Sequence, residues 1–238
     1  MQATNCGSNK QSNKQWIFAT LSFLLLAVVA IGYGLRIFAI GFYPTQLPGA
    51  IVRAHIVLVN AWLCVFLVQA ALGALGRMRA HRAFGLWGFA IGSLWALSAI
   101  FVWADMLRRE TDPETAQDAF ILISQILLFA LFLSLAWLAR RDGPVHKRMM
   151  ILAVSQIVIG GIQRSPIPFV HDNYARAQWL ALLFPLSIVA FDLFSLRRLQ
   201  RATAWGAALI LAVQLVRAPA SESPVWLAAA RWISSLGI

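Results

Sequence analysis

Two of the four histidines in this chain occupy matching positions, and they are the residues best suited to chemistry. His81 precedes Arg82 and His146 precedes Lys147, and each pair comes just before a long apolar stretch. If both stretches cross a membrane in the same direction, the two imidazoles lie at similar depth. Two imidazoles at one depth on neighbouring helices can provide the axial ligands of a haem b. The adjacent cations favour a simpler interpretation, in which both histidines lie among the lipid headgroups without a cofactor.

A second set of polar residues forms a stripe. His55, Trp62 and Gln69 follow one another at seven-residue steps, so on a helix they share one face. Such a stripe is expected to face the bundle interior, where a polar side chain is a candidate for binding because its burial is costly. The alternative is structural: His55, close to Arg53, lies at the membrane boundary, and Gln69 bridges two helices through hydrogen bonds. The residues alone leave both interpretations open.

A third set combines one carboxylate with several arginines. Asp192 lies near the end of an apolar stretch, where an acid needs a cationic partner. Arg148 or the neighbouring Arg197 and Arg198 can supply the positive charge, and the resulting ion pair would lock the bundle. Arg164, at the opposite end of the stretch that begins near Arg148, is a further candidate for a polar site.

The elements that must position these residues follow from composition. Apolar residues make up 60% of the 238 and charged residues only 12%, against about half and a quarter in soluble proteins. A spanning helix needs roughly 20 apolar residues, and lipid offers no partner to the backbone groups of an open strand. We therefore predict an all-α transmembrane bundle with seven spanning helices: Trp16–Ile40, Ala50–Leu75, Ala83–Ala104, Ala119–Ala139, Met149–Ile162, Gln178–Leu196 and Ala202–Val216.

The distribution of charge predicts the orientation of this bundle. One side carries twelve basic and two acidic residues, and the other carries eight basic and seven acidic residues. Because basic loops stay in the cytoplasm, the amino terminus is predicted to be cytoplasmic and the carboxyl terminus external, in the inner membrane of a bacterium. The formal charge of +11 is then directed at anionic lipid headgroups. No nucleic-acid partner is predicted.

Three further expectations concern organisation. Residues 1–15 form a cytoplasmic tail, 16–216 the membrane domain, and 217–238 an external tail with an interfacial helix after Pro224. Gly88, Gly92 and Ala96 form a small-residue stripe for close helix packing. Packing within the chain is the favoured role of that stripe, and a homodimer seam is the alternative.

Taken in order, the polar motifs resemble those of one family. They are His55, Trp62 and Gln69; His81-Arg82-x-x-Gly85; His146-Lys147-Arg148-Met149; Arg164; and Asp192 followed by Ala202-Thr203-x-x-Gly206. This series covers the second to seventh spans and resembles a bacterial family of predicted membrane proteins of unknown function. The resemblance implies that these are the family's characteristic polar residues, and it implies no reaction. Arg201 stands where we expect such proteins often to place a histidine, which weakens any role for that turn.

A fainter similarity is to the di-haem transmembrane cytochromes b that oxidise ascorbate. It is carried by His81 and Gly85, which match their His-x-x-x-Gly helix start, and it implies a haem between His81 and His146. Those proteins need a second histidine pair. The predicted helix Ala119–Ala139 contains no histidine to partner His55, so at most one haem is implied.

Three functions are consistent with the sequence. The favoured one is an integral membrane protein whose polar cluster serves binding or bundle architecture, without known catalysis. The second is a haem b electron carrier, linked to quinone, which would make the protein a membrane oxidoreductase. The third is a small-solute transporter. No dinucleotide, phosphate-loop, zinc-protease or nucleophile-elbow motif is present, and His171 beside Asp172 lacks metal-ligand spacing. The transporter would be lined by His55, Asn60, Gln69, Gln125, Gln156 and Asp192.

Overall fold

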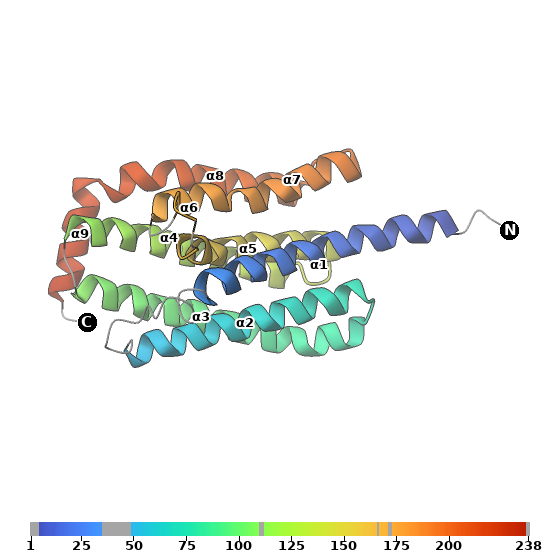
Figure 1. The fold of residues 1–238 in the computed structure, drawn as a ribbon, viewed down its shortest axis with the longest axis horizontal. Coiled ribbons are helices and arrows are strands. Elements are labelled where there is room, and N and C mark those ends of the chain that lie inside the picture. Colours follow the sequence, from blue (N-terminus) through green and yellow to red (C-terminus); the bar gives the residue numbers. More distant parts are fainter. Residues whose placement is uncertain (1–4, 35–48, 110–111, 166, 171–172, 237–238) are drawn as a thin grey trace.

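The computed structural model describes residues 5–34, 49–109, 112–165, 167–170 and 173–236, and in these residues every regular element is a helix. The predicted all-α class is therefore confirmed. Figure 1 shows the long helices running side by side, with a short last helix crossing one end. The helices are α1 (Asn5–Gly34), α2 (Ala50–Ala74), α3 (Met78–Arg109), α4 (Pro113–Leu138), α5 (Gly143–Gln163), α6 (Tyr174–Ala181), α7 (Leu183–Leu196), α8 (Arg201–Ser221) and α9 (Pro224–Ser235).

Six helical segments of the described chain are long and apolar enough to cross a membrane. They are α2, α3, α4, α5, the continuous stretch Ala175–Leu196 formed by α6 and α7, and α8. The apolar part of α1, Ile17–Gly32, is shorter, and the rest of the predicted first span, residues 35–40, lies outside the described chain. The chain is thus a multi-pass membrane protein by helix length and composition.

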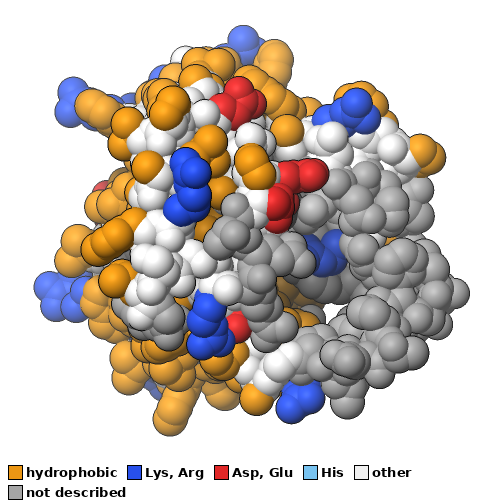
Figure 2. Space-filling view, turned by 90° about the vertical axis from the view of Figure 1, so that its left-hand side faces the viewer, with side chains coloured by type: hydrophobic (Ala, Val, Ile, Leu, Met, Phe, Trp, Pro, Cys, Tyr) orange, Lys and Arg blue, Asp and Glu red, His pale blue; other side chains and the backbone are white. Residues whose placement is uncertain are grey.

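The up-and-down order brings the basic hairpins together. The turns after α2, α4 and α7 lie at one end of the bundle, which we call the basic end, and Figure 1 shows the amino terminus extending beyond it. The opposite end, crossed by α9, is the α9 end. Figure 2 looks onto the α9 end, where hydrophobic side chains cover much of the flanks and acidic side chains lie on the end face.

Helix α5 is the centre of the bundle, because it contacts α1, α4, α6, α7 and α8. Every residue from Ile151 to Ile162 is buried. The approach of α1 is close: a Cβ on Gly161 would lie 2.7 Å from the Cα of Val29, and a Cβ on Gly32 would meet the Gly161 carbonyl. Both glycines therefore allow a backbone-to-backbone crossing that a larger residue would force apart.

The small-residue stripe of α3 faces α2 of the same chain. A Cβ on Gly88 would lie 3.1 Å from Val65, and one on Gly92 would meet the indole of Trp62. These contacts agree with the favoured role of the stripe in packing within the chain.

Several helices extend beyond the predicted spans, among them α3, α4, α5 and α8. The predicted fifth span begins at Met149, but α5 begins at Gly143, because the Asp142 side chain accepts a hydrogen bond from the Val145 N–H and Pro144 occupies the first turn. The predicted seventh span ends at Val216, but α8 continues through Pro219 to Ser221. The predicted external tail therefore starts inside a helix.

Two other helix ends have clear local causes. The predicted sixth span is divided at Leu182 into α6 and α7, where Pro185 lacks the N–H that would bond the carbonyl of Ala181. At the start of α4, Asp112 caps the helix by accepting the N–H groups of Thr115 and Glu114, and these bonds hold the pKa of its carboxyl below the usual range.

The last helix has the form expected of an interfacial helix. Ser223 caps α9, and Trp226 donates its indole N–H to the carbonyl of Ala116 at the start of α4. Ala230 is buried against the bundle, whereas Val225 and Trp232 are exposed. Helix α9 therefore lies across the ends of its neighbours with an apolar side uncovered.

Candidate cofactor site

The two matching histidines lie next to each other at the basic end. His81 is in the first turn of α3, His146 is in the first turn of α5, and their ring centroids are 6.2 Å apart with the planes at 88°. The prediction that they share one depth is confirmed. Their helices are not consecutive, so the antiparallel order of the bundle brings the two rings together.

Each ring is fixed by a backbone carbonyl. His81 donates from Nδ1 to the carbonyl of Gln69 at 3.1 Å, and His146 donates from Nδ1 to the carbonyl of Ala136 at 2.8 Å. Ala136 belongs to the last turn of α4, whose carbonyls have no partner within their own helix. A carbonyl only accepts, so Nδ1 of each ring carries a proton, and in the neutral imidazole Nε2 then has the free lone pair.

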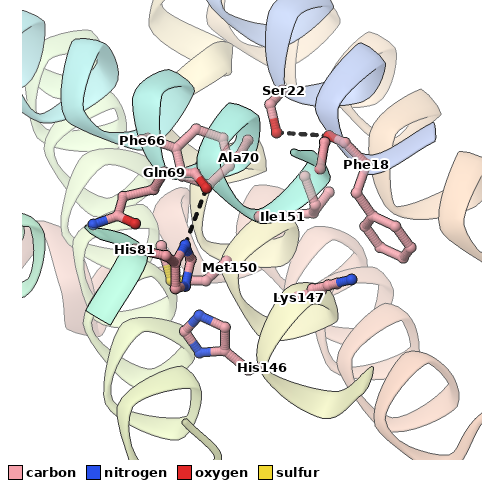
Figure 3. Close-up of a pocket in the computed structure, with 12 residues that line it drawn as sticks. Phe18, Ser22, Phe66, Gln69, Ala70, His81, His146, Lys147, Met150 and Ile151 are labelled. Carbon is pink, nitrogen blue, oxygen red and sulfur yellow. Dashed lines mark hydrogen bonds between the residues drawn. The ribbon is translucent and has the colours of Figure 1, made fainter. Parts of the chain in front are cut away.

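The two rings have a defined orientation. In Figure 3 the second ring nitrogen of each histidine is turned toward the other ring. A metal-binding histidine characteristically donates its other ring N–H to a carbonyl or carboxylate, which fixes the ring and its tautomer. Both imidazoles are oriented in this way by their contacts with the carbonyls of Gln69 and Ala136.

A cavity adjoins the two rings. Its empty space is about 510 Å³ when its open mouth is counted. Its wall is mainly apolar, with Lys147 as the one cation. The lining residues are Phe18, Ser22, Phe66, Gln69, Ala70, Gly73, Ala74, His81, His146, Lys147, Met150 and Ile151.

The residues at this cavity fit a flat, metal-centred macrocycle. In the described chain no group of three or more His, Cys, Asp or Glu side chains could hold a metal ion, so two imidazoles need the remaining ligands from the bound group. Gly73, Ala70 and Ala74 leave the α2 wall without bulky side chains. Lys147 can pair with a carboxylate of the macrocycle.

Only the geometry of the site itself indicates what it can bind. No protein-family model, curated protein or solved structure matches this chain. The two resemblances noted from the motifs therefore stay predictions.

The stripe on α2 faces α3, as expected for a bundle interior. His55 contacts the hydroxyl oxygen of Ser98 at 3.1 Å, and Trp62 is buried against Gly92. Gln69 lies at the cavity, but neither atom of its side-chain amide has a hydrogen-bond partner in the described structure. The expectation that this amide bridges two helices is therefore wrong, and its backbone carbonyl orients His81 instead.

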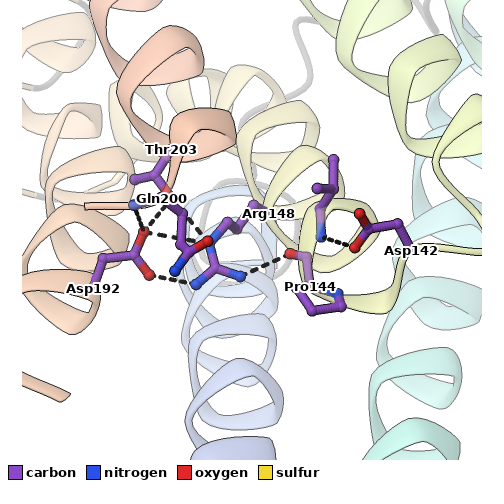
Figure 4. Close-up of polar contacts among 7 residues, drawn as sticks. Asp142, Pro144, Arg148, Asp192, Gln200 and Thr203 are labelled. Atoms are coloured by element: carbon purple, nitrogen blue, oxygen red, sulfur yellow. Dashed lines mark hydrogen bonds and ion pairs between the residues drawn. The ribbon is translucent and has the colours of Figure 1, made fainter. Parts of the chain in front are cut away.

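Arg148 and Asp192 form a separate buried cluster, shown in Figure 4. Arg148 donates from Nη2 to one carboxylate oxygen of Asp192 and from Nε to the other at 3.3 Å. Thr203 and the backbone N–H of Gln200 also donate to this carboxylate, at 2.6 and 3.1 Å. Arg148 also donates from Nε to the hydroxyl oxygen of Thr203 at 3.0 Å and from Nη1 to the carbonyl of Pro144 at 2.7 Å. The predicted pairing with Arg148 is confirmed.

The other predicted site residues lie elsewhere. Arg164 is at the α9 end, where it donates to the carbonyl of Gly160 at 3.0 Å. Of the residues named for a transporter, Asn60 is exposed and donates to its own helix at Ile56, whereas Asp192 is buried. His171 and Asp172 lie outside the described residues.

Arg217 belongs to a buried polar cluster that the sequence motifs did not indicate. The prediction placed Arg217 in the external tail, but its side chain is buried in α8. There it donates to Ser124, Gln178 and Gln214 at 2.8, 2.8 and 3.0 Å. In the sequence, Gln214 lies three residues before Arg217. This spacing could have indicated the cluster, because the two side chains share a helix face.

Proposed function

We propose that this protein is a membrane electron carrier that holds one haem b between His81 and His146. The observation that carries the proposal is the 6.2 Å separation of two imidazoles whose Nδ1 atoms are both bonded to carbonyls. With metal–nitrogen bonds of roughly 2 Å and ring nitrogens about 1 Å from their centroids, imidazoles on opposite sides of one metal have centroids about 6 Å apart. The observed spacing agrees with that value.

The residues around the cavity would give the bound group its properties. Haem b supplies a one-electron couple when bound. His81 and His146 would hold the haem between them, and a haem with two histidine ligands favours electron transfer. Phe66 and Ile151 exclude water, and Lys147 would attract a propionate at the basic end.

The proposal has a direct spectroscopic test. The protein, purified after expression with ample haem, is expected to show the sharp visible bands of a low-spin bis-histidine haem b after reduction with dithionite. Extraction of the haem and its assay as a pyridine complex should give about one haem per chain. A colourless preparation of folded protein would contradict the proposal and return the histidines to an architectural role.

We also propose the orientation and the location. The three basic hairpins and the amino terminus would face the cytoplasm of a bacterium, with anionic headgroups at the basic end. The α9 end and the carboxyl terminus would be external, and α1 would complete the seventh span. The gathering of the basic turns at one end supports this assignment.

Reporter fusions test this topology. A reporter that is active only in the cytoplasm is expected to work after Gly76, Asp142 or Gln200, because these positions lie in turns at the basic end. It is expected to fail after Asp112 or Ser223, at the α9 end. The reverse pattern would overturn the orientation, and a mixed pattern would show that one segment does not cross.

A further inference from the structure

A methionine accompanies the two imidazoles at the cavity of the basic end. His81 and His146 turn their second ring nitrogens toward each other, and Met150 lines the same cavity. Figure 3 draws the Met150 side chain next to the ring of His81. Met150 lies four residues after His146, and residues at this spacing share one face of a helix. Helix α5 therefore directs an imidazole and a thioether to the same cavity.

The spacing of the two rings suits a metal ion held directly between them. Their centroids are 6.2 Å apart, close to the separation that two metal–nitrogen bonds of roughly 2 Å produce. The carbonyls of Gln69 and Ala136 already hold both rings through Nδ1, as the outer partners of metal-binding histidines do. Neither ring therefore has to find a new orientation when an ion binds.

The charge around the cavity selects the kind of ion. The described lining contains no carboxylate and no cysteine, and Lys147 adds a positive charge. A divalent ion would keep both charges without an anionic ligand beside an apolar wall, and burial of such charge is costly. A monovalent ion keeps only one.

The ligand atoms narrow the choice further. Sodium and potassium ions prefer oxygen ligands, whereas thioether sulfur selects Cu(I), and imidazole also suits copper. Cu(I) is satisfied by two or three ligands in all, so it needs no macrocycle to complete its coordination. Two imidazole nitrogens and one thioether sulfur therefore form a suitable set for Cu(I).

We propose that His81, His146 and Met150 bind one Cu(I) ion in the haem-free protein, so that copper and haem compete for the same two imidazoles. The binding of copper is independent of the proposed function, whereas the competition rests on it. No electron is transferred when the ion binds. The lone pairs of the two Nε2 atoms and of the sulfur form the bonds to copper, and these neutral ligands release no proton.

The competition would make haem loading depend on copper. The basic end would face the cytoplasm, a reducing compartment in which copper stays monovalent. An ion bound to both Nε2 atoms leaves neither of them for a haem iron. The protein would therefore take up haem only where copper is scarce.

Competition with a coloured chelator measures the copper site. The full-length protein is expressed in cells that make no haem, with Cys6 and Cys64 replaced by alanine because thiolates also bind Cu(I). It is added without oxygen to the Cu(I) complex of bicinchoninate, whose absorbance falls as the protein takes the ion. We expect about one Cu(I) per chain, and the X-ray absorption spectrum of the complex should show sulfur as well as imidazole neighbours.

Two methionine variants separate the site from its surroundings. Met150→Leu keeps an apolar side chain of similar volume but removes the thioether, and it is expected to weaken Cu(I) binding by about tenfold or more. Met149→Leu makes the same change at a buried core residue that is not among those lining the cavity, and it should bind Cu(I) as the parent does. His146→Ala should leave the Cu(I) with the chelator.

The outcomes distinguish this inference from the proposed function. If the parent holds haem when haem is supplied but the haem-free protein takes no Cu(I), the copper site is wrong and the haem site stands. If the protein binds Cu(I) through sulfur and imidazole but never takes up haem, the proposed function fails and the copper site stands. Equal affinity of Met150→Leu and the parent, or a spectrum without sulfur, would overturn the assignment of Met150.

Haem added to the copper-loaded protein tests the competition itself. The absorbance bands of bound haem are expected to appear only after excess bicinchoninate has removed the copper. Uptake of haem at the same rate with and without copper would contradict the competition.

Discussion

Replacing either His81 or His146 by alanine is expected to abolish the low-spin haem b spectrum. Each substitution would remove one of the two proposed haem ligands, which the carbonyls of Gln69 and Ala136 orient. The reduced visible spectrum and the haem content per chain measure the effect. We expect the double variant to contain essentially no haem, and each single variant to lose its sharp bands even where some haem remains.

Gln69→Leu is the matched control for these variants. It changes the cavity wall next to His81 but leaves the backbone carbonyl that orients the ring, and it removes an amide with no partner in the described structure. Its spectrum should match that of the parent. An unchanged spectrum in His81→Ala or His146→Ala would show that the imidazoles are not the ligands.

The second large effect is expected at the buried ion pair. Asp192→Asn should lower the free energy of unfolding of the detergent-solubilised protein by about 3–5 kcal/mol, because Arg148 would keep its charge in a buried position without an anionic partner. Thr203 cannot compensate, since a hydroxyl carries no charge. Titration with a denaturing detergent, followed by circular dichroism, measures the loss.

A double-mutant cycle separates the pair from its neighbours. Arg148→Met should destabilise the protein to a similar extent, and combining it with Asp192→Leu should recover much of the loss, because no unpaired charge then remains. Arg140→Gln, at an exposed cation of the same end, should change stability by less than about 0.5 kcal/mol. Equal stability of Asp192→Asn and the parent would exclude a stabilising ion pair.

The sequence predicted the helices well where hydrophobicity alone decides the structure. The span Ala50–Leu75 agrees closely with α2, and Ala119–Ala139 lies largely within α4, because long apolar runs bounded by turns leave few alternatives. The start of α5 was missed because Lys147 and Arg148 interrupt its apolar pattern. The buried charge of Arg148 is compensated by Asp192 and bonded by Thr203, which come from α7 and α8 much later in the chain.

The histidine site was only partly predictable for a related reason. Equal depth follows from helix order, so His81 and His146 could be paired from the sequence. Their orientation depends on the backbone carbonyls of Gln69 and Ala136. Every residue has such a carbonyl, so the residue types do not indicate which carbonyls orient the rings. The ring contacts of Phe129 with Trp62 and Trp95 were likewise hidden, since these residues come from three helices and resemble ordinary core residues.

The central position of α5 has a consequence for how the protein is made. Of the six spanning segments, α5 is the most enclosed by protein and, with α8, the least apolar. A segment with Lys147 and Arg148 near its start partitions poorly into lipid by itself, so α5 is expected to enter the bilayer as a hairpin with α4. Asp192 and Thr203 are synthesised later, and the charge of Arg148 is neutralised only when α7 and α8 arrive. A ribosome that stops before α8 would therefore leave an incompletely assembled bundle for membrane quality control to recognise.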